Sequence, residues 1–238
     1  MAGESVTGGR AVAARRGWDW IASAWAMFKK QPGPWIGVIV ILLLIYVALG
    51  LLHAIGSLAA LVLGPVFGGG ILLGCRAADE GRALEVGHLF AGFRGRFGQL
   101  VLVGVLNLVA TAVIVLAVVL VTGVSLAVTA AQLESMPPAA LLSIALAILI
   151  IAALQLPVMM AVWFAPALVA LQGKDAVPAM QESFVGCLRN VVPFLVYGVI
   201  LFGLSLLASL LAGLGWLVLL PVIAASIYTS WKDIFTAP

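Results

Sequence analysis

The amino-acid sequence predicts an all-α polytopic membrane protein with six transmembrane helices, arranged as three hairpins that are each preceded by an amphipathic surface helix. Of its 238 residues, 64% are hydrophobic and only 9% are charged, whereas an ordinary soluble domain has about 25% charged residues. Two stretches of 41 residues, Trp35–Cys75 and Val191–Trp231, contain no Asp, Glu, Lys or Arg. A lipid bilayer is the solvent that suits such a chain, because lipid-facing side chains need no polar coat.

The first unit begins after a tail of small and polar residues, 1–14, which we expect to be disordered. No compact apolar segment with a cleavage site follows this tail, so we expect an uncleaved N-terminus and a single integral membrane domain over 15–238. Apolar residues then recur at helical spacing along one side of a predicted surface helix. These residues are Trp18, Ile21, Trp25 and Phe28. Their rings suit the headgroup zone of a membrane, where an aromatic side chain is half wet.

The charge-free stretch Trp35–Cys75 is too long for one crossing. A helix of this length would reach about 60 Å, twice the roughly 30 Å thickness of the hydrocarbon core. It is therefore expected to cross twice, with a turn near His53–Ser57. The second crossing carries Pro65, where we expect a kink or break. It also carries the glycines Gly68, Gly69, Gly70 and Gly74. Glycines allow helices to approach closely, so we expect this span to contact a second copy or another membrane protein.

The second unit starts in the polar loop 76–98. Its apolar stripe predicts a second surface helix and consists of Val86, Leu89, Phe90, Phe93 and Phe97. A third span is expected over Gln99–Val121, followed by an outer loop that contains Glu134. The next apolar stretch, Ala139–Gln172, predicts one tilted or kinked span with breaks at Pro157 and Pro166. The sequence leaves open whether this span is kinked or fully broken.

The third unit repeats the plan. Its surface helix has an apolar stripe formed by Val177, Met180, Phe184 and Leu188. Val191–Trp231 then crosses twice, with a turn at Gly213–Gly215. The three units, about 17–76, 85–174 and 176–233, each place a Pro-Val step in the second span, which predicts a threefold internal repeat. The alternative is chance similarity among six-span helical proteins, in which proline is common.

All 12 basic residues fall on one side of this six-span arrangement. Because positive residues mark the cytoplasmic side, we expect a bacterial inner-membrane protein with both termini in the cytoplasm. Aromatic and basic residues on this side are candidates for contact with lipid headgroups. They are Trp18, Trp25, Lys29, Lys30, Arg94, Arg96 and Arg189. The expected partners are membrane lipids and no nucleic acid.

Several short strings carry a family resemblance. They are GWDWI at 17–21, GCRAADEGR at 74–82, LFAGF at 89–93 and IYTSWKDIF at 227–235. Together they resemble an uncharacterised family of six-span inner-membrane proteins of proteobacteria. More distantly, the alternation of surface helix and hairpin is similar to the membrane domain attached to some glycerophosphodiester phosphodiesterases. No phosphodiesterase catalytic domain is present, so the resemblance implies a location and an architecture without a reaction.

Residues with catalytic or ligating chemistry are sparse. His53 and His88 are expected on opposite membrane faces, where they cannot share a metal or a haem. No metalloprotease, nucleophile-elbow, phosphate-loop or CxxC motif occurs, and we expect no enzyme activity, cofactor or metal. The acidic residues Asp79, Glu80 and Glu85 form the one carboxylate cluster. They either pair with Arg76 and Arg82 in the same loop or, with His88, bind a cation.

The predicted spans contain no Asp, Glu, Lys or Arg, although ion-coupled pumps depend on such residues. Asn107 and Gln155 either form hydrogen bonds between helices or line one polar cavity. These observations favour a non-enzymatic membrane protein that acts as a scaffold, assembly or lipid-interacting factor. The alternative is a transporter or channel for a neutral or amphipathic solute, with its site near the proline-broken helices.

Overall fold

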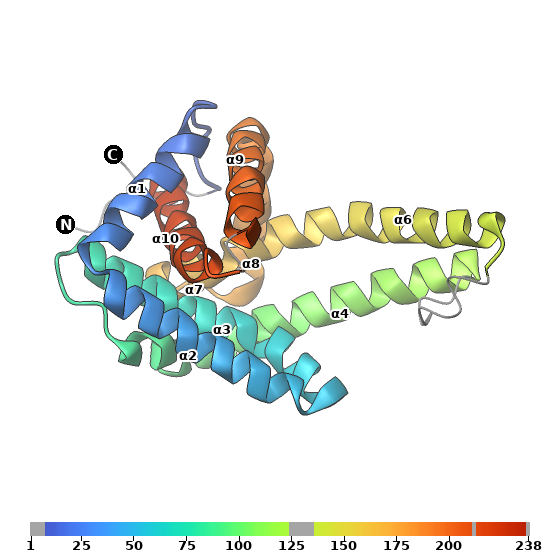
Figure 1. Ribbon diagram of the computed structural model, residues 1–238, viewed down its shortest axis with the longest axis horizontal. Coiled ribbons are helices and arrows are strands. Elements are labelled where there is room, and N and C mark those ends of the chain that lie inside the picture. The colour runs from blue at the N-terminus through green and yellow to red at the C-terminus, as the bar shows by residue number, and fades with distance from the viewer. Residues whose placement is uncertain (1–7, 124–135, 211–212, 237–238) are drawn as a thin grey trace.

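A computed structural model describes residues 8–123, 136–210 and 213–236, and the regular elements in these ranges are helices (Figure 1). The first unit comprises α1 (Arg16–Lys30), α2 (Pro32–Gly50) and α3 (His53–Asp79). The second comprises η1 (Val86–Phe93), α4 (Phe97–Thr122), α6 (Pro138–Trp163) and α7 (Ala165–Gln172). The third comprises α8 (Ala176–Arg189), α9 (Val191–Leu210) and α10 (Trp216–Phe235).

The element order confirms the predicted all-α fold. A surface segment, a first span and a second span follow one another three times, and six helical stretches are long and apolar enough to cross a membrane. One surface segment differs from expectation, because η1 is a 3₁₀ helix of eight residues and not an α-helix. Such helices occur as short pieces, and this one ends just before Gly95, whose φ of +69° turns the chain toward α4. The outer loop with Glu134 lies outside the described residues.

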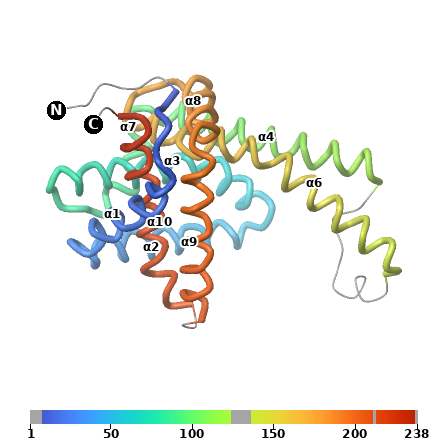
Figure 2. Tube along the Cα trace, turned by 90° about the horizontal axis from the view of Figure 1, so that it is seen from above, coloured from blue at the N-terminus to red at the C-terminus, as the bar shows by residue number. Residues whose placement is uncertain are grey.

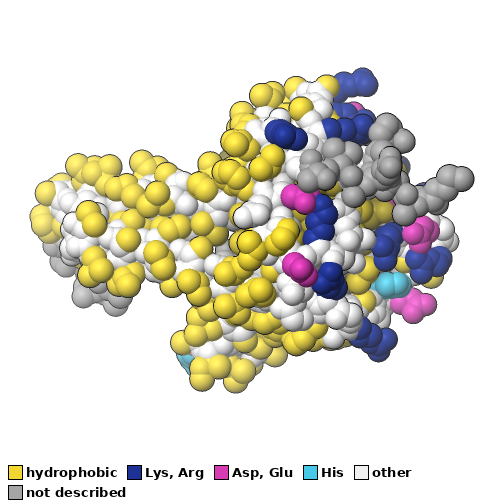
Figure 3. All heavy atoms as spheres, turned by 180° about the vertical axis from the view of Figure 1, so that it is seen from behind, with side chains coloured by type: hydrophobic (Ala, Val, Ile, Leu, Met, Phe, Trp, Pro, Cys, Tyr) yellow, Lys and Arg dark blue, Asp and Glu magenta, His cyan; other side chains and the backbone are white. Residues whose placement is uncertain are grey.

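The three hairpins diverge from a common base. In Figure 1, α4 and α6 run side by side as a long arm that projects away from the other helices, and Figure 2 shows the hairpin of α9 and α10 pointing in a different direction. Figure 3 shows charged side chains gathered at the end of the molecule opposite the arm, while the arm itself is covered by apolar side chains. The arm is strongly exposed, for example at Leu120 (73%) and Leu149 (66%). This surface is suited to lipid.

The core lies at the base, where the inner parts of the second spans meet. Buried residues run along α3 from Pro65 onward, along α7, and along α10 from Leu219 onward. The largest fully buried side chains include Trp20, Trp35, Phe164 and Phe235, and the last two rings are 5.2 Å apart. Each unit therefore contributes its second span to the core.

Glycines on α3 and its neighbours permit contact between backbones. A Cβ atom on Gly70 would lie 2.6 Å from the carbonyl oxygens of His88 and Leu89, and one on Gly92 would lie 2.0 Å from the carbonyl oxygen of Val66. Gly69 and Gly74 face side chains of α4, α7 and the segment around η1. Gly69, Gly70 and Gly74 are therefore in contact within the chain, whereas Gly68 has only the Pro166 Cβ near its Cβ position, at 4.0 Å, and a partner at this span stays a prediction.

Of the two predicted breaks in the fourth span, the one at Pro166 is close to the observed interruption, and the one at Pro157 is not observed. Helix α6 runs through Pro157, and the interruption falls at Phe164, between α6 and α7. There the hydroxyl of Ser183 accepts a hydrogen bond from the Phe164 N–H (2.9 Å) and donates one to the carbonyl of Met160 (2.7 Å). The hydroxyl thus replaces the helical bond between these two groups, and Pro166 lacks the N–H that would continue the ladder.

The predicted turns are close to the observed ones. The turn between α9 and α10 includes Gly213, whose φ is +79°. The first hairpin turns slightly earlier than predicted, at Leu51–Leu52, and His53 is the first residue of α3. Helix α3 continues through Pro65, so the helix is not broken at this proline.

The close packing of α4 on α3 can be tested at Gly104. A Cβ atom there would lie 2.2 Å from the Val62 carbonyl oxygen, so Gly104→Ala is expected to push the two helices apart and to destabilise the protein by about 1–3 kcal/mol. Gly98→Ala is the control in the same helix, because nothing lies within 4 Å of its Cβ position. Thermal unfolding in detergent measures both variants, and equal midpoints would contradict the close packing.

Candidate functional site

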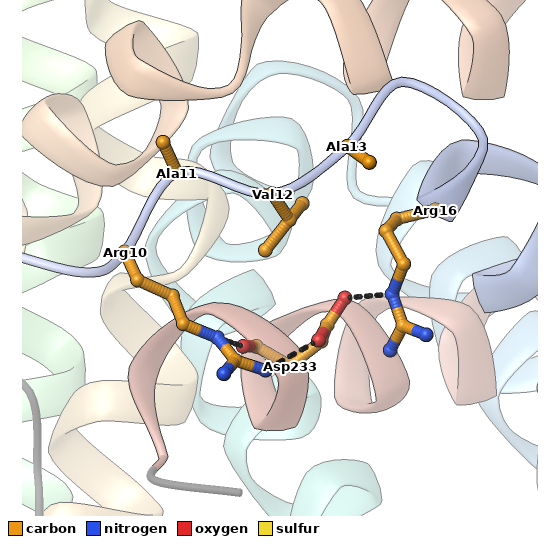
Figure 4. A pocket seen from close by; sticks show the side chains of 6 residues that line it. All are labelled: Arg10, Ala11, Val12, Ala13, Arg16 and Asp233. Carbon is orange, nitrogen blue, oxygen red and sulfur yellow. Dashed lines mark hydrogen bonds and ion pairs between the residues drawn. The ribbon is translucent and has the colours of Figure 1, made fainter.

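Near the end of α10, the carboxylate of Asp233 is buried and accepts hydrogen bonds from three side chains. Arg10 Nη2 donates to Oδ1 at 2.8 Å, Arg16 Nε donates to Oδ2 at 2.7 Å, and Trp20 Nε1 donates to Oδ2 at 2.9 Å. Figure 4 shows the two guanidinium groups approaching Asp233 from opposite sides. The hydrogen bond with Asp233 raises the pKa of Arg16 above its ordinary value, against the effect of burial. One carboxylate therefore joins two cations and a buried indole.

Arg10 belongs to a segment, residues 8–14, that we call the N-terminal strap. The Arg10 N–H donates to the carbonyl of Ile234 (2.9 Å), and the Val12 N–H donates to Asn190 Oδ1 (2.8 Å). Asn190 Nδ2 donates in turn to the carbonyl of Arg10 (2.9 Å). The strap is thus bonded to α10 and to the end of α8, which differs from the disordered tail predicted over 1–14. Residues 1–7 lie outside the described part of the chain.

Helix α1 brings Arg16 and Trp20 to the site by packing closely on α9 and α10. A Cβ atom on Gly17 would lie 2.3 Å from the Pro193 carbonyl oxygen, so only glycine allows this approach. The ring of Trp20 lies 5.3 Å from that of Phe194, and Thr229 Oγ1 donates to the Trp20 carbonyl at 3.0 Å. The buried face of α1 therefore contains Gly17, Trp20 and Ala24 and coincides only in part with the predicted stripe.

Two open cavities meet at Arg10, Arg16 and Asp233. The first, of about 490 Å³, is bordered otherwise by the strap residues 11–13 (Figure 4). The second, of about 440 Å³, extends between α1, α3 and α10, and we call it the polar cavity. Its lining consists of Arg10, Arg16, Ser23, Asp79, Tyr228, Thr229, Lys232, Asp233 and Thr236. Three cationic groups face two carboxylates in this cavity, which leaves an excess of one positive charge.

The second carboxylate of the polar cavity, Asp79, is compensated by α10. Tyr228 donates its hydroxyl to Asp79 Oδ2 at 3.0 Å, and Lys232 Nζ lies 2.5 Å from the same oxygen. Asp79 ends α3, so these contacts fasten the inner ends of two second spans to one another.

The predicted acidic cluster does not converge. The Asp79 carboxylate accepts a hydrogen bond from Tyr228 of α10, and Glu80 pairs with Arg82. Glu85 caps η1, where the His88 ring accepts a hydrogen bond from the Glu85 N–H at 3.0 Å. Among the described residues, no group of three or more His, Cys, Asp or Glu side chains is placed to hold a metal ion. Of the two alternatives for this cluster, pairing with arginines of the same loop is observed for Glu80 and Arg82.

The predicted headgroup residues fall into two groups. Trp18 and Trp25 are exposed (56% and 42%), Lys29, Lys30 and Arg94 are exposed as well, and Lys29 Nζ lies 6.0 Å from the centre of the Trp25 ring. Arg96 and Arg189 instead have partners within the chain. Arg96 pairs with Asp175 at 2.8 Å, and Arg189 donates to the Gly9 carbonyl of the strap at 2.7 Å.

The two predicted intramembrane polar residues lie on facing helices. Gln155 Nε2 donates to Thr111 Oγ1 at 3.1 Å, and Thr111 is one helical turn beyond Asn107 on α4. The Gln155 Oε1 atom is buried with no partner among the described residues. Neither Asn107 nor Gln155 lines the two cavities at Asp233. Gln155 thus forms the interhelical hydrogen bond that was one of the two expected roles.

Sequence reasoning missed the Asp233 site because it ended the last span before Lys232. Helix α10 extends to Phe235 and α3 to Asp79, so both helices continue beyond the predicted charge-free stretches and carry Asp233 and Asp79 near their ends. A usable signal is present in the sequence: an acid directly after a long apolar stretch requires a nearby cation. Both Trp20 and Asp233 also fall within the strings that carry the family resemblance.

The six apolar helices, the lipid-facing arm and the charged base define a polytopic helical membrane protein. The chain is 32% identical over 242 residues to a probable inner membrane protein of Burkholderia thailandensis, and the match covers 92% of this chain and 89% of the relative. The chain belongs to the family of this protein and is a multi-pass inner-membrane protein. No protein-family model and no solved structure matches it, so the distant resemblance to the phosphodiesterase-linked domains has no support.

The role of Asp233 can be tested with Asp233→Asn. The amide presents N–H groups to guanidinium groups that are themselves only donors, so we expect a loss of about 1–3 kcal/mol in stability. We also expect release of the strap, measured as faster tryptic cleavage after Arg10 and Arg16. Asp19→Asn is the control, because Asp19 contacts Arg16 only at 3.5 Å and its side chain is 35% exposed. Equal cleavage of the two variants would show that Asp233 does not hold the strap.

Proposed function

We propose that this protein is a non-enzymatic inner-membrane protein that acts through contacts with anionic lipids at the cytoplasmic face, as a scaffold, assembly or envelope-maintenance factor. The observation that carries this proposal is how the surface segments pack. In α8 the buried face consists of small residues such as Ala179, Ser183 and Gly186, while Val177 and Leu188 are exposed. In α1 the small residues Gly17 and Ala24 are likewise buried, together with Trp20 and three other large apolar residues, while Trp18 and Trp25 are exposed.

This packing leaves large apolar and basic side chains on the outside. In η1, Leu89 and Gly92 are buried, while Phe90 and Phe93 are exposed. An exposed aromatic ring beside a lysine or arginine, at the end of a set of spans, suits the lipid headgroup level. Each Lys or Arg near an anionic membrane surface contributes about 1 kcal/mol. The same side chains would be costly on a protein surrounded only by water.

The orientation is part of the proposal. The described strap and the end of α10 lie side by side, joined by the hydrogen bond between Arg10 and Ile234, so these two segments belong to one membrane face. That face contains the basic residues, which supports a cytoplasmic location.

The orientation is tested by reporters fused after Pro238. A fluorescent protein that folds only in the cytoplasm is expected to be fluorescent, and a phosphatase that is active only in the periplasm is expected to be inactive. The same phosphatase inserted at the outer turn, between Leu51 and Leu52, is the positive control. An active phosphatase at the C-terminus would refute this orientation.

The lipid function is tested by substituting the exposed lysines of α1. The double variant Lys29→Gln, Lys30→Gln is expected to retain several-fold less anionic lipid in nanodiscs of mixed composition, because it loses about 1 kcal/mol of attraction per lysine. Native mass spectrometry counts the retained lipids. Lys174→Gln is the control, since the Lys174 amine pairs with Glu182 at 2.5 Å and its side chain is only 19% exposed. A wild-type protein with no preference for anionic lipid would refute the function.

One cavity favours a second function, transport of a neutral or amphipathic solute. It has a volume of about 270 Å³ and lies between α6, α8 and α9, beside Pro157. Its lining is apolar and consists of Leu156, Met159, Met160, Trp163, Cys187, Val191, Phe194 and Leu195. A site between hairpins near a proline is the arrangement expected of a transporter, and flexible methionines suit variable apolar ligands.

A further inference from the structure

We propose that the polar cavity between α1, α3 and α10 is a binding site for a phosphate group, carried by a lipid headgroup or free in the aqueous phase. This inference rests on the proposed lipid function and gives it a defined site. Four different parts of the chain build the cavity: the N-terminal strap, α1, the end of α3 and the end of α10.

Each arginine of the site has N–H groups that are not used in hydrogen bonds to the described part of the protein. Arg10 uses Nε and Nη2 on Asp233, and Arg16 uses Nε on Asp233 and Nη1 on Asp19. Arg10 Nη1 and Arg16 Nη2 have no hydrogen-bond partner among the described residues. A guanidinium fork matches the geometry of phosphate oxygens and binds them with charge-assisted hydrogen bonds. Two such groups border the same cavity, so their remaining N–H groups are available to one anion.

The carboxylates of the cavity do not cancel this preference. Asp233 is 7% exposed and is surrounded by its three donors, and Asp79 already accepts from Tyr228 and Lys232. Both carboxylates are therefore compensated by partners within the chain; Asp233 is buried, and the Asp79 side chain is 31% exposed. The excess positive charge lies on Arg10, Arg16 and Lys232, whose side chains are 37%, 38% and 53% exposed. These three cationic groups are accessible to an anion in the cavity and outnumber its two carboxylates.

The cavity also lies at the level where phosphate groups of lipids occur. Lys232 and Asp233 end an apolar span, and α1 carries the exposed aromatic rings Trp18 and Trp25 that suit the headgroup zone. The hydroxyl of Ser23, which has no hydrogen-bond partner among the described residues, adds a neutral donor from α1. Phosphate is thus favoured over a carboxylate ligand, because the donors come from several sides and can engage several oxygens.

The experiment places a negative charge in the cavity without disturbing the arginines. Ser23 is exposed and lines the cavity, so Ser23→Asp is expected to fold. It is also expected to weaken retention of a phosphatidylglycerol molecule by more than about tenfold, because like charges a few ångströms apart at a protein surface repel one another. Ala22→Asp is the matched control, since Ala22 is exposed on the same helix and does not line the cavity. Native mass spectrometry of the full chain, released from nanodiscs of phosphatidylcholine and phosphatidylglycerol, measures retention.

A second arm separates the two sources of phosphate. Inorganic phosphate is titrated against the protein in detergent, and a rise in unfolding temperature that Ser23→Asp abolishes and Ala22→Asp preserves assigns the site to free phosphate. Retention of phosphatidylglycerol with the same variant pattern assigns it to lipid. The proposal is overturned when Ser23→Asp and Ala22→Asp behave alike in both arms. In that case, a preference for anionic lipid that still depends on Lys29 and Lys30 would leave the proposed function intact.

Discussion

The buried carboxylate of Asp233 is the interaction on which the arrangement of the base depends. An uncompensated carboxylate in an apolar environment is very costly, so the folded state must supply donors from nearby. Those donors come from the strap, from the first turn of α1 and from Trp20, which are more than 200 residues away in the sequence. Satisfying Asp233 therefore joins the first unit to the third and closes the chain on itself.

The other contacts of the base depend on small residues that let helices approach closely. Gly17 lets α1 approach α9, Gly92 lets η1 approach α3, and Gly186 lies against the ring of Phe235. Within a membrane, close packing replaces the hydrophobic effect as the main attraction between helices. Each surface segment thus has small residues in its contact with the spans, beside large side chains such as Trp20 and Leu89, while other large apolar side chains, such as Trp18 and Phe90, remain exposed.

Much of the architecture could be predicted from the sequence. The absence of charge over Trp35–Cys75 and Val191–Trp231 determines the number of crossings, because helix length and bilayer thickness are both fixed by physics. The face on which a surface helix packs could not be predicted in the same way. In α1, the hydrophobic pattern predicts a buried face with Trp18 and Trp25. Both faces of a membrane-surface helix meet apolar surroundings, however, so the fit to the neighbouring helices decides which face is buried. The observed buried face contains Gly17 and Trp20. The break near Pro166 could be predicted from the proline, but the part of Ser183 in it could not, since that hydroxyl comes from α8.

The division between a compact base and an exposed arm has a consequence for how the protein responds to lipid. In the arm, α4 and α6 contact each other through few polar groups, among them Gln155 and Thr111, and lipid must cover the rest. In the base, ion pairs and hydrogen bonds link the strap, α1, α3 and α10, so an anion bound there would contact elements from both ends of the chain. On this proposal, lipid at the arm would solvate the fold, whereas an anion at the base would add contacts between the strap, α1, α3 and α10. A ligand that binds only the folded form stabilises it by mass action, so an anionic lipid bound at the base would make the stability of the protein depend on membrane composition.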